Sequence, residues 1–315
     1  MSVIALIESE NNVIKKSGWE AASYGCAVTD AINTSLIAVT FNQENTETLA
    51  EYGVDKIINI SLASSFSVAA YSANLAAVAK EENATIVIIN GTANGKYVGP
   101  VLATKIDAAY LSNVVSLPES YDSLTVKRSC FTNKAFNHTE SHKSVNVISL
   151  AVNSFGLQPK TSTPTQEEKE GIVVESALSI DKVEKTSATV TIADADIVVS
   201  GGRGLKGPEH WDLVENLATV LGAATACSKP VSDMGWRPHS EHVGQTGKPV
   251  ATNLYIAIGI SGAIQHIAGI NASKVKVVIN NDPEAPFFKA ADYGVVGDAF
   301  EIVPRLTEKL QALKS

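Results

Sequence analysis

The sequence predicts an α/β protein built from two doubly wound parallel-sheet domains. Short runs of β-branched residues alternate with longer amphipathic segments, which is typical of a parallel sheet covered by helices. The chain has 315 residues, whereas a single domain usually has about 100–200. With 45% hydrophobic and 18% charged residues, its composition is that of a globular protein and not of a disordered chain.

The first domain is predicted over residues 1–187. Its parallel strands are expected at Val3–Glu8, Ser35–Phe41, Lys56–Ile60, Thr85–Asn90 and Val145–Val152. Its helices are expected at Gly18–Ile32, Ser65–Glu82 and Tyr97–Lys105. The segment Leu124–Phe131 is predicted as a further strand, followed by a polar loop at Thr132–Ser144, which adds an antiparallel element.

A connection between the domains is predicted at residues 160–187. The composition changes at Gln158–Glu170, which holds two prolines, four Ser or Thr residues and a run of charges, and Asp181–Ser187 is charged again. Part of this stretch, Gly171–Leu178, is expected to have some structure. The alternative is an exposed loop inside one domain.

The second domain is predicted over residues 188–315. Its strands are expected at Ile192–Ser200, Ala223–Ala226, Leu254–Ile258, Val275–Asn280 and Tyr293–Gly297. Its helices are expected at Pro208–Leu221, from about Ser261, and at Pro304–Lys314. Pro208 suits a first helical turn, where no N–H is needed. Ligands of such sheets bind beyond the carboxyl ends of the strands, so the loops there are the candidate site.

The overall balance of charges and cysteines excludes several classes of function. A net charge of -8 argues against nucleic acid or an anionic membrane as the main partner. The three cysteines form no CxxC pair, which argues against a disulfide scaffold or a zinc site. The N-terminal apolar run is too short for a signal peptide, and no run approaches about 20 apolar residues. We therefore expect a cytoplasmic protein without membrane insertion.

Two glycine-rich turns and one long loop stand out in the second domain. The turns are Ser200–Gly204 and Gly259–His266. In Gly259–His266, small residues allow a ligand close to the backbone, and the N-terminus of the following helix favours an anion such as pyrophosphate. A tight strand-to-helix turn needs the same residues, so this reading stays open. The loop Cys227–Lys248 is long enough to fold over a ligand. Within it, Ser228, Gln245 and Thr246 offer neutral hydrogen bonds, and Lys229 offers a positive charge.

The motifs VSGGRG, VGQTGK, LYIAIGISGAIQHIAGI and VVINNDPEAPFFKAADYGVVGD resemble the alpha subunit of electron transfer flavoproteins. The resemblance is specific across Ile197–Pro304 and looser over Val3–Val115, where GKYVGPVLATKIDAAYLSNVV carries it. It implies a C-terminal FAD-binding domain of the flavodoxin-like or DHS-like type. It also implies an electron carrier, not an enzyme, with no catalytic residue.

By resemblance, the FAD would be held non-covalently by residues from each loop of the second domain. These are Arg203, Ser228, Lys229, Val243, Gly244, Gln245, Thr246, Ser261, Gly262, Ala263, Ile264, Gln265, His266, Asn280, Asp298 and Ala299. Thr246 would donate to flavin N5, and His266 would lie by the C2 carbonyl, where negative charge develops on reduction. The alternative for His266 is a helix-capping or core histidine.

The resemblance further implies the partners. The chain would pair with a beta subunit that holds AMP, accept electrons from acyl-CoA dehydrogenases in fatty-acid oxidation, and pass them to a membrane quinone oxidoreductase. A bifurcating or nitrogen-fixation-linked carrier stays open. A self-contained flavin or nicotinamide oxidoreductase is the remaining alternative, but the sequence offers no poised base for it.

Two details concern charge and metal binding at the site. The family commonly has arginine where this chain has Lys229. The permanently charged, planar guanidinium is thus replaced by an ammonium group whose pKa can shift on burial.

The other histidines, His138, His142, His210, His239 and His242, are predicted at the surface. No metal site is expected, because the spacing of His239 and His242 lacks further ligands.

Overall fold

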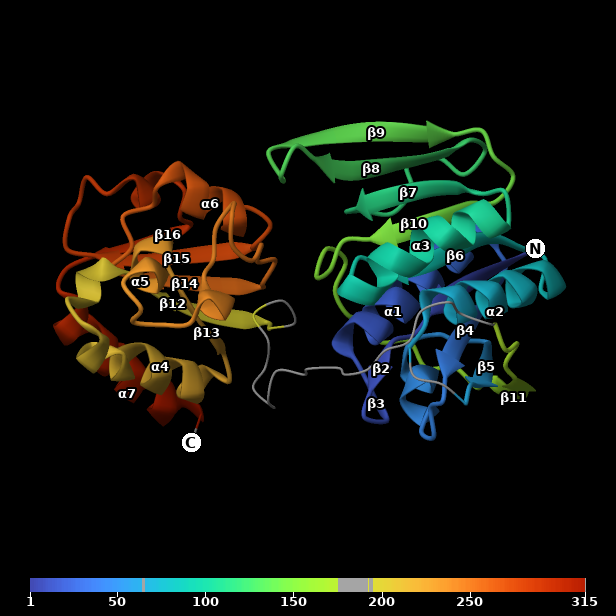
Figure 1. The fold of residues 1–315 in the computed structure, drawn as a ribbon, viewed down its shortest axis with the longest axis horizontal. Helices are drawn as coiled ribbons and strands as arrows, with labels where there is room; N and C mark the ends of the chain where they lie inside the picture. Colours follow the sequence, from blue (N-terminus) through green and yellow to red (C-terminus); the bar gives the residue numbers. More distant parts are fainter. Residues whose placement is uncertain (64–65, 175–191, 193–194, 315) are drawn as a thin grey trace. The chain divides into compact units, whose positions relative to one another are not determined.

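The computed structural model describes residues 1–63, 66–174, 192 and 195–314. The chain divides into two compact units, Met1–Cys130 with Ala135–Val183, and Phe131–Lys134 with Glu184–Ser315 (Figure 1). We call them unit 1 and unit 2. The predicted border after residue 187, the charged stretch Asp181–Ser187 and the second half of Gly171–Leu178 lie outside the described residues.

Unit 1 contains a mixed sheet of nine strands in the order β11-β5-β4-β1-β6-β10-β7-β8-β9. The strands are β1 (Ser2–Leu6), β4 (Ser35–Phe41), β5 (Lys56–Ser61), β6 (Ala84–Asn90), β7 (Ala109–Val114), β8 (Leu124–Cys130), β9 (Ala135–Ser141), β10 (Asn146–Leu150) and β11 (Thr165–Glu170). Pairing is parallel except at β7–β8 and β8–β9. The strands β2 (Ser9–Glu10) and β3 (Val13–Ile14) form a separate small hairpin.

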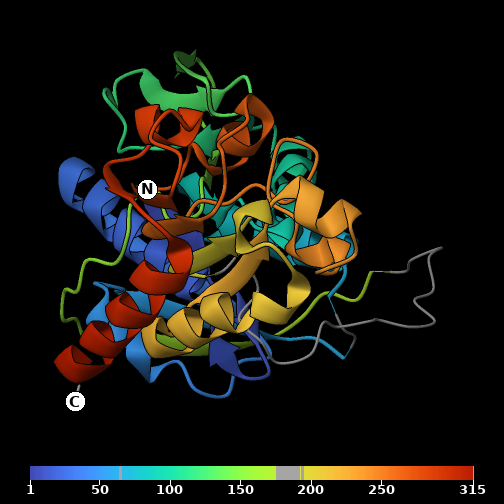
Figure 2. The ribbon, with the colours of Figure 1, turned by 90° about the vertical axis from the view of Figure 1, so that its left-hand side faces the viewer.

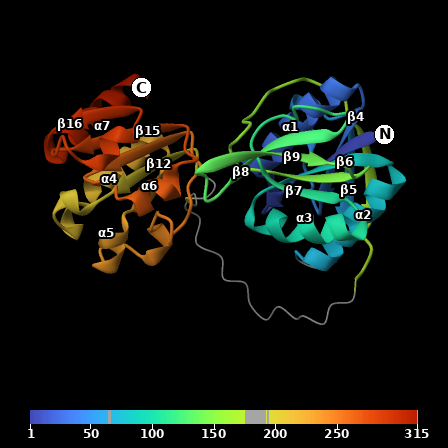
Figure 3. The ribbon, with the colours of Figure 1, turned by 90° about the horizontal axis from the view of Figure 1, so that it is seen from above.

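Helices cover both faces of this sheet. Helix α1 (Lys16–Ile32) packs on one face, and α2 (Val68–Glu81) and α3 (Ala93–Lys105) lie together on the other (Figure 3). The central strand β1 is buried along its whole length, as expected for a parallel strand between two helix layers. Ser67 and Thr92 cap α2 and α3 through their hydroxyl groups. The predicted start of α2 at Ser65 lies outside the described residues.

Two of our loop predictions in unit 1 are wrong. The predicted loop Thr132–Ser144 contains β9, which pairs with β8 over its full length. The predicted connection contains β11, which pairs in parallel with β5. Both strands are largely exposed and polar, so no apolar alternation marks them. Ladder hydrogen bonds and ion pairs such as Lys56–Glu167, at 2.8 Å, hold β11 in the sheet.

Unit 2 contains a parallel sheet in the order β13-β12-β14-β15-β16. Its strands are β12 (Ile197–Gly201), β13 (Ala224–Cys227), β14 (Leu254–Ile258), β15 (Val275–Asn280) and β16 (Tyr293–Val296). Helix α6 (Ile264–Ile270) covers one face, and α4 (Asp212–Leu221) and α7 (Ala299–Lys314) lie side by side on the other (Figures 1 and 2). The α/β fold class with two sheets is confirmed, and only the second sheet is wholly parallel.

Two boundaries in unit 2 differ from the prediction. Strand β12 begins at Ile197 and not at Ile192; residues 193–194 lie outside the described residues. Helix α7 begins at Ala299, before Pro304, because the Asp298 carboxylate accepts a hydrogen bond from the Phe300 N–H at 2.9 Å. Over the described ranges, none of the helices combines the length and apolar character that a membrane span requires.

Candidate functional site

The carboxyl edge of the unit 2 sheet has a topological switch point between β12 and β14. These strands are neighbours, yet the helices that follow them, α4 and α6, cover opposite faces (Figure 1). Loops that leave a sheet in opposite directions open a crevice between them, which is where ligands of such sheets bind. Most of the predicted site residues lie at this edge.

The turns after β12 and β14 are packed backbone to backbone. The Gly202 N–H donates to the Ile258 carbonyl at 2.8 Å, and the Gly204 N–H donates to the Gly259 carbonyl at 3.0 Å. A Cβ atom at Gly202 would overlap the Gly259 carbonyl oxygen. The glycines at 202 and 204 are therefore required by packing of the two turns against each other. Arg203 lies exposed between them, in a short 3-10 helix.

The turn before α6 presents backbone donors to its surroundings. Among the described residues, the N–H groups of Gly262, Ala263, Ile264 and Gln265 have no carbonyl partner. A hydrogen bond from the Phe287 N–H to the Ser261 carbonyl, at 3.0 Å, holds the backbone of this turn in place. Gly262 has a φ of +86°, and a Cβ there would lie 2.5 Å from the Phe287 nitrogen.

The loop after β13 is held against α6. The long loop predicted at Cys227–Lys248 is interrupted by α5 (Lys229–Asp233) and a 3-10 turn at His239–Glu241. The Gln245 N–H then donates to the Gln265 carbonyl at 2.7 Å. A Cβ at Gly269 would lie only 2.6 Å from the Gly244 Cα. These contacts bring Val243–Thr246 beside Ser261–His266, with the side chains of Gln245 and Thr246 exposed.

His266 is buried beneath this loop, with 6% of its surface exposed. Its Nε2 lies 3.0 Å from the Tyr255 hydroxyl, and its ring packs near Phe287. Its Nδ1 has no hydrogen-bond partner in the described part of the chain. Burial, reinforced by His242, lowers the pKa of His266 to about 4, while the Val243 carbonyl acts in the opposite direction. The imidazole is therefore neutral at pH 7.

The prediction that His242 lies at the surface is wrong, because only 2% of it is exposed. Its backbone bridges to Cys227, which draws the side chain under the loop. Burial, followed by the charges of His239 and Lys229, lowers the pKa of His242. His239 is exposed. No cluster of metal-ligating side chains was found among the residues that the structure describes.

Ser228 and Lys229 lie just beyond the end of β13. The Ser228 N–H donates to the Gly201 carbonyl at 3.1 Å, which ties the start of α5 to the turn after β12. The Lys229 ammonium forms an exposed ion pair with Asp233 at 3.3 Å. In this arrangement Lys229 carries a solvated charge near the switch point.

Three predicted residues lie at the carboxyl ends of β15 and β16: Asn280 is the last residue of β15, and Asp298 and Ala299 follow β16. The Asn280 side chain donates to the Ile260 carbonyl at 3.1 Å and accepts from the Asp282 N–H at 3.0 Å, so it braces the turn before α6. Asp298 caps α7, and Ala299 is the buried first residue of that helix. The structure gives these three residues structural contacts within unit 2.

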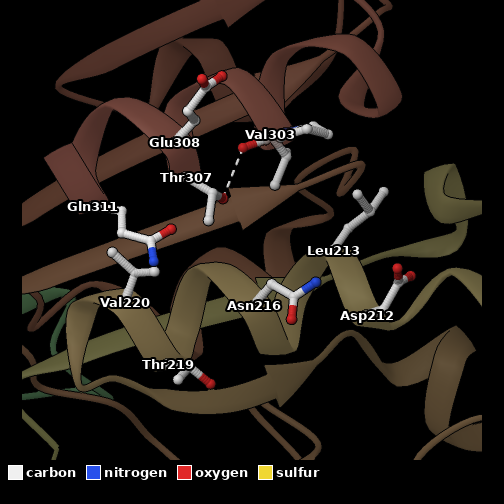
Figure 4. A pocket seen from close by; sticks show the side chains of 10 residues that line it. Asp212, Leu213, Asn216, Thr219, Val220, Val303, Thr307, Glu308 and Gln311 are labelled. Carbon is white, nitrogen blue, oxygen red and sulfur yellow. Dashed lines mark hydrogen bonds between the residues drawn. The ribbon is translucent and has the colours of Figure 1, made fainter.

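A groove of about 560 Å³ lies elsewhere in unit 2, between α4 and α7 (Figure 4). Its lining includes Asp212, Asn216 and Glu308, and Thr307 donates to the Val303 carbonyl at 2.8 Å. None of the predicted site residues lines it. The groove is therefore separate from the carboxyl-edge site.

Comparisons with known proteins address both units. A family profile described as "Electron transfer flavoprotein domain" matches residues 3–179, and one described as "Electron transfer flavoprotein FAD-binding domain" matches residues 191–271. The chain is 34% identical over 320 residues to "Electron transfer flavoprotein subunit alpha" of Bacillus subtilis, with 99% of this chain and 98% of the relative covered. The chain belongs to the electron transfer flavoprotein alpha-subunit family.

Other members of the family support the same assignment. The alpha subunit of Paracoccus denitrificans is 41% identical over 227 residues, covering 70% of each chain. A probable mitochondrial alpha subunit of Caenorhabditis elegans is 39% identical over 233 residues, covering 73% of this chain and 69% of the relative. The match to the family's FAD-binding domain spans the two glycine turns, the loop after β13 and α6, and ends before Asn280.

Tyr255 is a residue near the site that sequence reasoning missed. It lies inside β14 and is fully buried, so its pattern is that of an ordinary core residue. Only the packing of α6 over β14 shows that its hydroxyl meets His266.

Proposed function

We propose that the chain binds one FAD at the carboxyl edge of the unit 2 sheet and works as the alpha subunit of a heterodimeric electron carrier. The observation that carries this proposal is the group of donors around the turn before α6, within the match to the family's FAD-binding domain. Free backbone N–H groups suit a pyrophosphate, which needs several donors and carries negative charge.

The residues at this edge fit two parts of such a cofactor, the pyrophosphate and the flavin ring. Ser261 and Gln265 lie exposed beside the free N–H groups, where they can add hydrogen bonds to phosphate oxygens. Thr246 and His266 lie on the side of the loop after β13, where a flavin ring would need a donor at N5 and a polar group at the C2 carbonyl. The buried His266 Nδ1, which has no partner in the described residues, is a polar atom that a bound ring would satisfy.

Bound FAD would supply one-electron redox chemistry, while the protein holds and orients it. No acid or base on a substrate is needed for such a carrier. We propose a beta subunit holding AMP as the partner, acyl-CoA dehydrogenases as donors and a membrane quinone oxidoreductase as acceptor. The cytoplasmic location, and the choice between this carrier and a bifurcating or nitrogen-fixation-linked one, stay predictions.

The test is to co-express the chain with its beta subunit, remove bound flavin and titrate the complex with FAD. Thr246→Val should weaken FAD binding about fivefold, because one hydrogen bond contributes about 1 kcal/mol. Thr307→Val is the matched control in the groove between α4 and α7 and should leave FAD affinity unchanged. A complex that takes up no FAD contradicts the proposal. NADH oxidation by the chain alone would favour the self-contained oxidoreductase.

A further inference from the structure

Tyr255 and His266 form a buried pair beneath the proposed flavin site. Tyr255 has no exposed surface, and its hydroxyl lies 3.0 Å from His266 Nε2. The rings of Tyr255 and His266 are tilted, with centroids 6.0 Å apart, and the ring centroid of Phe287 lies at the same distance from that of His266. The imidazole is therefore confined by aromatic neighbours and can change its hydrogen bonding little without moving β14 or the turn before α6.

The hydrogen bond between the two side chains has two alternative directions. A phenol carries one hydrogen and a neutral imidazole carries one, on either nitrogen. Burial raises the pKa of the Tyr255 phenol above its usual value, so the phenol keeps its hydrogen. That hydrogen needs an acceptor in a dry environment.

The surroundings favour donation from tyrosine to histidine. If Nε2 carried the proton and donated to the phenol oxygen, both the phenol hydrogen and His266 Nδ1 would lack partners in the described residues. If the phenol donates to Nε2, only Nδ1 lacks one. Ser200 is also fully buried, but its Oγ has no hydrogen-bond partner in the described residues, so it does not take the phenol hydrogen away from Nε2.

We propose that Tyr255 is a positioning residue for His266: its hydroxyl donates to Nε2 and so fixes the imidazole with its proton on Nδ1. The bond made by one ring nitrogen decides the state of the other. His266 then offers an N–H donor and no positive charge. The role of this N–H rests on the proposed function, because the ligand atom that it would bind is a carbonyl oxygen of the flavin.

The surrounding charges agree with a neutral donor. His242 faces His266 from the loop after β13 and lowers the pKa of His266. His242 in turn is influenced by His239, Lys229 and Asp233, and only Asp233 acts to raise its pKa. No described carboxylate contacts the His266 ring, so a proton on both nitrogens has no counter-charge.

The test is nitrogen NMR on the full chain labelled with 15N-histidine, without FAD. His266 is identified by the signal lost in His266→Asn. We expect an Nδ1–H tautomer in the wild-type chain and a mixture of tautomers in Tyr255→Phe. Because the phenol stabilises only the neutral ring, Tyr255→Phe should also raise the pKa of His266, by about one unit.

The control is Tyr24→Phe in unit 1, which removes a buried phenol that donates to the Ser116 carbonyl at 3.1 Å. It should leave the His266 signals unchanged. An Nε2–H tautomer in the wild-type chain, or a lower pKa of His266 in Tyr255→Phe, overturns the proposal. If Tyr255→Phe does not fold, the wild-type tautomer still decides it.

A second readout uses the complex with the beta subunit. Tyr255→Phe should bind FAD about fivefold more weakly than wild type, while Tyr24→Phe should bind it equally well. If no variant binds FAD, the proposed function fails, and the NMR result still decides the role of Tyr255. If the wild-type chain has the Nδ1–H tautomer but Tyr255→Phe binds FAD as tightly as wild type, the proposed role of Tyr255 in flavin binding is overturned.

Discussion

Both units have loops at the carboxyl ends of their parallel strands, but the polar groups there have different partners. In unit 1, the loop after β10 donates three backbone hydrogen bonds to the buried Glu20 carboxylate, from Asn153, Phe155 and Gly156 at 2.9–3.0 Å. In unit 2, the N–H groups of the turn before α6 have no carbonyl partner among the described residues. The loop after β10 is therefore closed by a side chain of unit 1 itself, whereas the turn before α6 leaves its donors ready for an anion.

Polar side chains in neighbouring loops of unit 1 also form hydrogen bonds within the unit. The Asn42 side chain forms hydrogen bonds with both the N–H and the carbonyl of Leu62, and Thr40 donates to Asn59 at 2.9 Å. In unit 2, Gln245, Thr246 and Gln265 point to solvent. Of the loop after β10 and the turn before α6, only the first has a carboxylate of its own chain as acceptor, so we expect only the second to take up an anion, and the following substitutions test this comparison.

The largest effect is expected for Glu20→Ala, which removes the carboxylate that accepts hydrogen bonds from the loop after β10 in unit 1. Glu20 is 1% exposed, and its loss leaves three backbone donors without a charged acceptor. We expect a loss of about 4 kcal/mol in the free energy of unfolding, measured with urea. Glu20→Gln should lose less, and FAD affinity of the folded complex should not change. A loss below about 1 kcal/mol would show that the hydrogen bonds to Glu20 contribute little to stability.

A smaller loss is expected for Gly202→Ala at the open edge of unit 2. The new methyl group would overlap the Gly259 carbonyl oxygen, which is backbone and cannot move aside as a flexible side chain could. We expect about 3 kcal/mol of destabilisation and loss of FAD binding. Gly91→Ala, after β6 in unit 1, is the matched control, because its Cβ would lie 3.1 Å from the Leu150 carbonyl oxygen. Equal losses at both positions would argue against a special constraint at the unit 2 turns.

The third-largest expected effect is the change in the free energy of unfolding with pH. The pKa of His266 is about 4 in the folded chain against an ordinary value of 6.5, so between these values the unfolded chain binds a proton that the folded chain does not. Stability is therefore fully present above pH 6.5 and falls as the pH drops toward 4. From pH 7 to pH 5, His266 should remove about 2 kcal/mol.

The measurement is urea unfolding of wild type and His266→Asn at both pH values. The difference between the two proteins isolates His266 from the carboxylates, which titrate in both. If the wild type and the variant lose stability in parallel, the imidazole is not held neutral by burial.

The smallest effect on stability is expected for Lys229→Met. The ion pair with Asp233 is exposed on both sides, 58% and 55%, so its loss should change the free energy of unfolding by under about 0.5 kcal/mol. The midpoint potential of bound FAD should fall, because a positive charge near the ring favours the added electron. Lys309→Met on α7 is the control and should leave the potential unchanged. Equal potentials in both variants would place Lys229 outside the influence of the flavin.

Much of the fold could be predicted from local sequence. The strands β4, β14 and β15 have the bounds predicted for them, because buried parallel strands are continuous apolar runs between turn residues. The polar strands β9 and β11 were predicted as loop or connection, because their strand state depends on a neighbouring strand and not on their own pattern. For the site, the sequence grouped Val243–Thr246 with Ser261–His266 only by resemblance, and the hydrogen bond from the Gln245 N–H to the Gln265 carbonyl shows that they are neighbours.

By itself the sequence determined where the glycine turns, the apolar strands and the family motifs lie, because each depends on residues close together in the chain. The tertiary structure decided that His242 is buried, that Asn280 braces a turn, and that the Tyr255 hydroxyl meets His266. Those outcomes depend on which atoms packing brings together across a sheet. Burial and hydrogen-bond partners, which set the chemistry of a side chain, are properties of that packing.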